Sequence, residues 1–192
     1  MELVGYDELM LWLIFGVAAI ALIGLFVVST YNKLVTQRNR VDNAWGQVEV
    51  QLQRRYDLIP NLVETVKGYA SHESATFRDV AEARSAASSA GTPAEQAQAD
   101  GLLTAALRQL FAVAEDYPEL RASENFTRLQ GDLTDTENKV AVSRQIYNDT
   151  VLTYNTLVQQ IPSNIVAGIT GFSTRELYDA PDLADTAPDV SF

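Results

Sequence analysis

The chain has 192 residues, a formal net charge of −11 and no cysteine, which excludes disulfides, thiolate metal sites and cysteine nucleophiles. Its one histidine, His72, would need carboxylates to complete a metal site within one chain. The acidic balance argues against nucleic acid as a partner, because phosphate binding needs a basic face. Only Lys33, Lys67 and Lys139 are lysines. An acidic, lysine-poor surface also suits solubility in strong salt.

An apolar run near the N-terminus predicts a membrane anchor. Residues 9–28 read LMLWLIFGVAAIALIGLFVV, without a charge or a proline. At 1.5 Å per residue such a helix is about 30 Å long, the thickness of a hydrocarbon core. The residues before it are acidic and no A-x-A site follows, unlike a signal peptide. We therefore assign residues 9–30 to a retained transmembrane helix and residues 1–8 to a short extracytoplasmic segment.

Basic residues near the ends of the span predict its orientation. None precedes the span, whereas Lys33, Arg38 and Arg40 follow it closely. The positive-inside rule then places the N-terminus outside and residues 31–192 in the cytoplasm of a single-pass protein of the cell membrane. The same three cations could also contact anionic headgroups, at about 1 kcal/mol each. The alternative is that they only set the topology, and the two roles are compatible.

Apolar residues recur every three or four positions in the rest of the chain, which is the period of an α-helix. This spacing predicts helices over about 31–87, 93–116 and 123–161. The first gap contains Gly91 and Pro93, and the second contains Tyr117-Pro118, where the residue before proline avoids helical angles.

No segment alternates as a strand would. The predicted fold class is therefore all-α, with the transmembrane helix followed by a four-helix bundle of long antiparallel helices over residues 31–178. An acidic tail follows at residues 179–192.

The predicted helices differ in length, which makes Pro60 a candidate joint. Residues 31–87 would form a helix about 85 Å long, whereas residues 93–116 would span only about 35 Å. Either the first helix bends at Pro60 and folds against the others, or its membrane-proximal half packs against another subunit. The candidate interface for the second case is formed by Val41, Trp45, Val48 and Leu52.

An arginine interrupts the apolar row of the first helix. Arg55 falls on this row, between Arg54 and Asp57. A buried arginine must be paired and hydrogen-bonded. We expect a structural polar layer in which Arg55 pairs with an acid of the third helix such as Glu137. The full candidate set is Arg54, Arg55, Asp57, Glu137 and Arg144. The alternative is a polar groove that binds a peptide or a lipid headgroup.

Motifs for catalysis are sparse. His72-Glu73 is the one His–carboxylate pair in sequence, and a zinc-protease helix would need a second histidine where Thr76 stands. The sequence contains no phosphate-binding G-x-x-x-x-G-K-[ST], no G-x-G-x-x-G and no G-x-S-x-G. We therefore expect no enzyme activity, no metal and no cofactor.

Three stretches carry a resemblance to a known family. They are YNKLVTQRNRVDNAWGQVEVQLQRRYDLIPNLVETVKGYASHE, AVAEDYPELRASENFTRLQGDLTDTENKVAVSRQIYND and YNTLVQQIPSNIVAGITGF, which together cover most of residues 31–172. They closely resemble the LemA family. The resemblance implies one N-terminal membrane helix followed by a four-helix bundle, with residues 164–178 supplying a short last helix or an ordered cap. The departures are mild: the acidic tail, and Gly46 at a helical position.

The resemblance also implies an accessory role, because the family is similar to proteins found beside membrane-bound zinc metalloproteases and envelope-stress components. We expect a membrane-anchored scaffold or adaptor that self-associates as a homo-oligomer. It would present its bundle to other membrane proteins, such as a membrane metalloprotease, in envelope maintenance or membrane proteolysis. The alternative is a lipid- or peptide-binding module that uses the polar groove.

Overall fold

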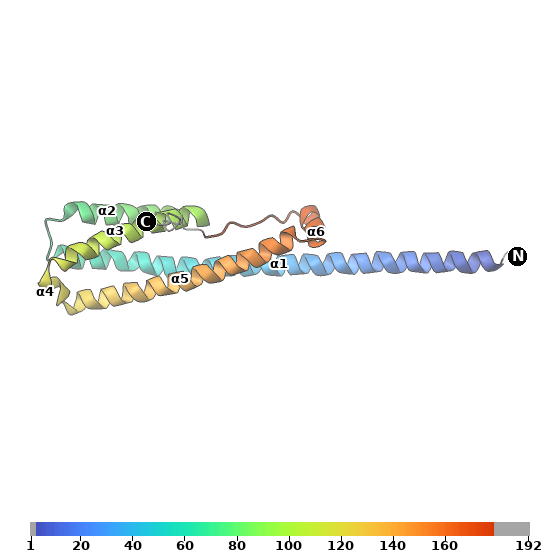
Figure 1. The fold of residues 1–192 in the computed structure, drawn as a ribbon, viewed down its shortest axis with the longest axis horizontal. Helices are drawn as coiled ribbons and strands as arrows, with labels where there is room; N and C mark the ends of the chain where they lie inside the picture. Colours follow the sequence, from blue (N-terminus) through green and yellow to red (C-terminus); the bar gives the residue numbers. More distant parts are fainter. Residues whose placement is uncertain (1–2, 179–192) are drawn as a thin grey trace, which may run out of the picture. The chain divides into compact units, whose positions relative to one another are not determined.

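The computed structural model describes residues 3–178 and is helical throughout its regular elements (Figure 1). The helices are α1 (Leu3–Lys67), α2 (Ser74–Ser89), α3 (Pro93–Glu115), α4 (Pro118–Arg121), α5 (Glu124–Gln159) and α6 (Ser163–Thr170). No strand occurs within the described residues, so the predicted all-α class is confirmed. The acidic tail expected at 179–192 lies outside the described residues.

The chain divides into two compact units. The anchor unit combines Met1–Val41 with Leu152–Arg175, and the bundle unit combines Asp42–Val151 with Glu176–Phe192. Helices α1 and α5 contribute residues to both units.

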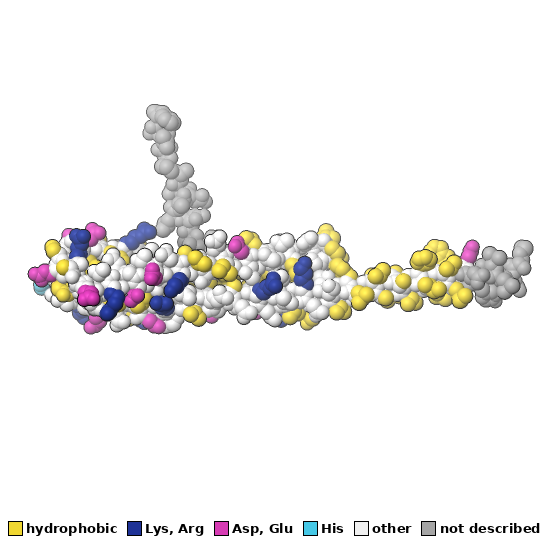
Figure 2. Space-filling view, turned by 90° about the horizontal axis from the view of Figure 1, so that it is seen from below, with side chains coloured by type: hydrophobic (Ala, Val, Ile, Leu, Met, Phe, Trp, Pro, Cys, Tyr) yellow, Lys and Arg dark blue, Asp and Glu magenta, His cyan; other side chains and the backbone are white. Residues whose placement is uncertain are grey.

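In the anchor unit, α1 carries a stretch that is long and apolar enough to cross a membrane. Its side chains are open to the surroundings, as the hydrophobic surface of this stretch shows (Figure 2), and Trp12 is 76% exposed. Burial begins at Thr30 and is complete at Leu34. Helix α6 supplies Val166 and Ala167 to the buried part of the chain.

In the bundle unit, the second part of α1 packs with α2, α3 and α5. Side chains at helical spacing form the core, and its largest apolar members include Ile59, Leu62, Val66, Val80, Leu103, Leu110 and Val140. Helix α2 packs on α3, which begins with a capping box formed by Thr92 and Glu95. The sequence predicted the bounds of α3 and α5 closely. Each of these helices begins and ends within two residues of its expected bounds.

The first predicted helix is wrong at its C-terminal end. Helix α1 stops at Lys67 rather than near residue 87, and the chain reverses through residues 68–73 before α2. The amides of Gly68 and Ala70 still donate to the carbonyls of Glu64 and Val66, which closes the last turn. Glycine is a poor helix former and helps to end α1 here. The apolar period continues across the break because both helices bury an apolar face.

The apolar row expected to lie uncovered is covered by the chain itself. Val41, Val48 and Leu52 are 2%, 0% and 3% exposed. The ring of Trp45, in the bundle unit, lies 5.2 Å from the ring of Tyr147 and 6.2 Å from that of Tyr178, centroid to centroid. Val41, Val48 and Leu52 therefore do not offer a free surface to another subunit, whereas Trp45 is partly buried. Of the two expected alternatives, the structure has the one in which the chain covers this row itself.

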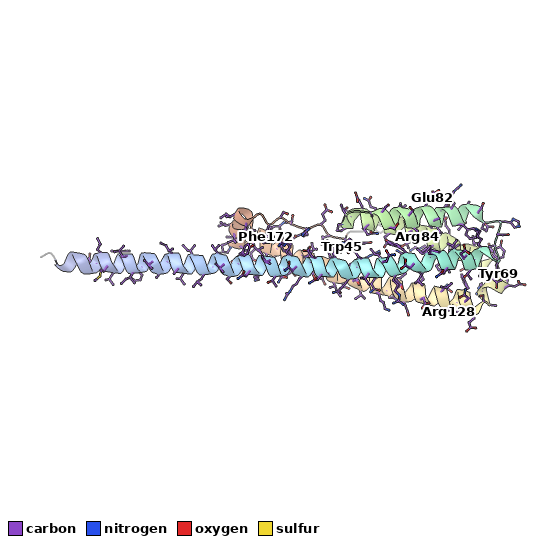
Figure 3. The ribbon with its side chains drawn as sticks, turned by 180° about the vertical axis from the view of Figure 1, so that it is seen from behind. Trp45, Tyr69, Glu82, Arg84, Arg128 and Phe172 are labelled. Carbon is purple, nitrogen blue, oxygen red and sulfur yellow. The ribbon has the colours of Figure 1, made fainter. Side chains whose placement is uncertain are left out.

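Pro60 is not a joint, because α1 continues through it and the proline ring is exposed. A proline has no N–H to donate to the carbonyl four residues earlier, which is that of Tyr56. The structure gives this carbonyl another donor, since Nε of Arg84 on α2 lies 2.8 Å from it. Figure 3 shows Arg84 on the side of α2 that faces α1. Pro60 thus leaves the Tyr56 carbonyl without a helical donor, and Arg84 of α2 donates to it instead.

This pairing predicts coupling between positions 60 and 84. Arg84→Ala should lower the free energy of unfolding by about 1.5–3 kcal/mol, the range for a hydrogen bond from a charged group. In a Pro60→Ala background the restored amide can bond the Tyr56 carbonyl, so the same change should cost clearly less. Denaturant unfolding of the four chains measures the difference, and Arg78→Ala on the exposed side of α2 is the control. An equal loss of unfolding free energy on Arg84→Ala in both backgrounds would contradict the hydrogen bond between Arg84 and the Tyr56 carbonyl.

Candidate functional site

A buried charge cluster lies at the centre of the bundle unit. Arg55 of α1 is fully buried, although it carries a charge. Its guanidinium forms an ion pair with Asp100 of α3, and its Nη2 lies 2.7 Å from Oε1 of Glu137 on α5. The same Nη2 donates to Oγ1 of Thr104 at 2.8 Å. One arginine therefore links three helices.

A second arginine reaches the same carboxylate. Arg144 of α5 forms an ion pair with Asp100, and its guanidinium carbon lies 4.5 Å from the centre of the Tyr178 ring. The hydroxyl of Tyr178 donates to Oδ2 of Asp100 at 3.4 Å. Burial lowers the pKa of Arg144, with Arg55 acting in the same direction and Tyr178 opposing it. Burial also raises the pKa of Tyr178, against the opposing effect of Arg144. Two arginines and two carboxylates give the cluster no net formal charge.

The structure brings together only part of the predicted polar layer. Arg55, Glu137 and Arg144 meet in the cluster, whereas Arg54 and Asp57 are exposed. Asp57 instead accepts a hydrogen bond from Nε2 of Gln53 at 2.8 Å.

Sequence reasoning missed Asp100 and Tyr178. Asp100 interrupts the apolar face of α3 as Arg55 interrupts that of α1, so the same rule would have found it. Tyr178 lies in an extended segment, where no helical period points to it.

The extended segment after α6, residues 172–178, is called the strap below. In the anchor unit, Asn155 of α5 donates to the carbonyl of Arg175 and accepts from its amide, both at 2.8 Å. The hydroxyl of Tyr154 donates to the carbonyl of Ser173 at 2.9 Å. These bonds use only the main chain of the strap.

The bundle unit repeats this arrangement one heptad earlier on α5. Asn148 donates to the carbonyl of Tyr178 at 3.0 Å and accepts from its amide at 2.8 Å. The hydroxyl of Tyr147 donates to the carbonyl of Glu176 at 2.8 Å. The Tyr-Asn pairs are seven residues apart in the sequence of α5, and their strap partners are three residues apart.

A cleft of about 410 Å³ opens beside the charge cluster between α3 and α5. Its lining includes Arg55, Thr104, Arg108, Phe111 and Glu137. Nε of Arg55 is buried and has no hydrogen-bond partner within the described chain. Arg55 and Arg108 are the cations of the lining, and Glu137 adds a carboxylate that pairs with Arg55. The walls are partly apolar, with Leu107, Phe111 and Leu133, and partly polar, with Thr104, Gln130 and Thr134.

The three predicted membrane-proximal cations have different surroundings in the anchor unit. The guanidinium carbon of Arg38 lies 5.2 Å from the centre of the Phe172 ring, and that ring meets Tyr31 edge to face at 5.8 Å between ring centres. Lys33 lines a shallow pocket, and Arg40 is exposed. Arg38 therefore holds the start of the strap through a cation–π contact.

His72 is exposed in the turn between α1 and α2. Among residues 3–178, no group of three or more His, Cys, Asp or Glu side chains is placed to hold a metal ion.

The geometry defines a class of protein: an all-α chain whose first helix carries a stretch suited to span a membrane and also the first helix of a bundle with an ionic centre. A profile of the LemA family matches residues 44–192, more than half of the chain. The chain belongs to the LemA family, as the sequence resemblance predicted.

Similar proteins share most of its length. Magnetosome protein MamQ 2 of Paramagnetospirillum magneticum is 28% identical, over 81% of this chain and 67% of that protein. MamQ of Magnetospirillum gryphiswaldense is 27% identical over the same shares. Protein LemA of Metamycoplasma hominis is 21% identical, over 96% of this chain and 84% of that protein.

The ion pairs predict that removing Asp100 destabilises the protein more than removing Glu137. Asp100→Ala removes the one group between Arg55 and Arg144 and leaves buried positive charge, so it should lower the free energy of unfolding by about 3–5 kcal/mol. Glu137 is 38% exposed at its side chain, and Glu137→Ala should cost about 1 kcal/mol or less. Denaturant unfolding in detergent measures both. Similar losses would mean that Asp100 is not the centre of the cluster.

The main-chain bonds predict local release of the strap. Asn155→Ala removes both hydrogen bonds to Arg175, which should raise the exchange rate of its amide by roughly 5–30-fold at about 1 kcal/mol per bond. Hydrogen exchange followed by mass spectrometry or NMR measures the change. Asn138→Ala, an exposed asparagine on the same helix, is the control and should leave the rate unaltered. An unchanged rate in Asn155→Ala would show that this side chain does not hold the strap.

Proposed function

We propose that the chain is a membrane-anchored helical scaffold or adaptor, which presents its bundle to further copies of itself and to other membrane proteins. The observation that carries this proposal is the continuity of α1. One uninterrupted helix, Leu3–Lys67, contains both the stretch suited to span a membrane and the first helix of the bundle. An anchored domain searches for partners in two dimensions and meets them at a raised effective concentration.

The use of the charged side chains supports a structural role for the bundle interior. Arg55, Asp100 and Arg144 pair with one another across helices. Groups engaged in this way fix helices, and their chemistry is directed inward. We therefore propose a role without catalysis.

The outer face of α5 is the surface we propose for self-association. Val142 and Ile146 stand one helical turn apart and are 58% and 45% exposed. Neighbouring apolar side chains on one face of a helix favour packing against a second apolar surface. This surface replaces the one expected at Val41, Trp45, Val48 and Leu52, three of which are buried within the chain.

The sequence and the family support our proposal for the orientation and for the class of partner. Lys33, Arg38 and Arg40 favour a cytoplasmic bundle by the positive-inside rule. The resemblance to LemA proteins favours a partner among membrane proteins such as a membrane metalloprotease. Two of the relatives named above are magnetosome proteins by name, and an accessory role of this kind beside other membrane proteins would suit this chain as well.

A second candidate function rests on the cleft between α3 and α5. Arg108, the cation of the lining that is not part of the charge cluster, would together with the ring of Phe111 suit the carboxylate end of a peptide or an anionic headgroup. A binding module of this kind would gain thermal stability on adding its ligand.

The mass of the intact particle distinguishes these functions. Full-length protein in mild detergent should have the mass of several protomers, and Val142→Asp with Ile146→Asp should reduce it to one. Leu102→Asp, at an isolated exposed leucine of α3, is the control and should keep the assembly. A single-protomer mass for the unaltered chain would contradict self-association and favour the binding module.

A further inference from the structure

Helix α6 has one side that packs and one that does not. Ser163, Val166 and Ala167 are buried. On the other side Ile165 and Ile169, one turn apart, are 60% and 82% exposed, and Ile161 just before the helix is 77% exposed. Single exposed apolar residues are ordinary, but Ile165 and Ile169 stand one turn apart on α6 and Ile161 lies in the turn just before it. These three exposed isoleucines are called the strip below. Nothing in the described chain covers this strip.

The strip adjoins the apolar stretch of α1 within the anchor unit. The amide of Phe172, at the end of α6, donates to the carbonyl of Ala167 at 3.0 Å. The ring of Phe172 packs on Tyr31, which comes three residues after Val28 at the end of the apolar run. Figure 1 shows α6 beside α1 where the bare stretch of α1 begins, with its axis turned away from that of α1. Helix α6 is thus placed at the level where the span would leave the hydrocarbon core.

The composition around α6 suits a surface that contacts lipid. Residues 150–174 contain no charged residue, although a fifth of the whole chain is charged. The first basic residue after this stretch is Arg175, and Arg38 and Lys33 lie on α1 just beyond the span. In sequence the stretch is bounded by Asp149 on one side and by Arg175 and Glu176 on the other. An uncharged apolar segment next to cations such as Lys33 and Arg38 is typical of the boundary between acyl chains and headgroups.

We propose that α6 is an interfacial helix, which lies in the plane of the bilayer surface and inserts Ile161, Ile165 and Ile169 between the lipids. A bilayer is the occupant that the strip fits best, because the strip continues the apolar surface of the span. This contact would fix the rotation and tilt of α1, since a span held at two points cannot turn freely. The proposal rests on the membrane anchor and is independent of self-association.

The absence of native cysteine makes a direct test simple. Full-length chains with Ile165→Cys or Ile169→Cys each receive a nitroxide label and are reconstituted into phosphatidylcholine–phosphatidylglycerol vesicles. Power saturation compares collisions of the label with oxygen, which concentrates in lipid, and with a water-soluble nickel chelate. Leu25→Cys in the span is the lipid reference, and Lys139→Cys is the water reference. Both reference side chains are exposed.

The expected result is a nickel accessibility at both isoleucine positions several-fold below that at position 139, with oxygen accessibility close to that at position 25. Nickel accessibility equal to that at position 139 would overturn the proposal. Low accessibility to both reagents would overturn it too, because a protein surface would then cover the strip. If the label at position 25 is itself open to nickel, the anchor fails and the proposal fails with it.

Discussion

The arrangement of the bundle depends on the ion pairs that neutralise the buried charge of Arg55. Arg55 stands on the apolar face of α1, fully buried, where an unpaired guanidinium would be strongly unfavourable. Asp100 of α3 and Glu137 of α5 pair with it. These pairs can form only at one register of the three helices along their axes. Apolar faces alone tolerate small shifts along a helix, whereas an ion pair with a hydrogen bond to Thr104 does not. We therefore attribute to this cluster the register of the bundle more than its net stability.

Polar groups of the main chain, like the buried charge, need partners. The carbonyl that Pro60 leaves without a helical partner accepts from Arg84, and the main chain of the strap is hydrogen-bonded by asparagine and tyrosine side chains of α5. Backbone polar groups that leave regular structure must find partners elsewhere. The aromatic ends of the strap add to this, with Phe172 against Arg38 in the anchor unit and Tyr178 against Arg144 in the bundle unit.

The sequence predicted those features that rest on local periodicity. The stretch of α1 suited to span a membrane follows from an unbroken apolar run, and α3 and α5 follow from apolar spacing. The position of Arg55 on an apolar face predicted that it would need an acid. The turn at Gly68 was missed because the apolar spacing continues on both sides of it. Pro60 was misjudged because its usual cost assumes a carbonyl without a partner, and Arg84 is a partner from a different helix. The strap could not be predicted, since most of its contacts are hydrogen bonds to its main chain, and its two aromatic side chains, Phe172 and Tyr178, are too few to form a periodic pattern.

The most direct test of the central claim is a distance between α1 and α5 with and without the charge cluster. Spin labels at Gln53→Cys and Lys139→Cys, both exposed positions in the bundle unit, report this distance by double electron–electron resonance. The unaltered cluster should give one narrow distribution. A chain with leucine at positions 55, 100, 137 and 144 should keep its helix content but give a broad or divided distribution. An equally narrow distribution at the same distance would contradict the claim that the buried charges set the register.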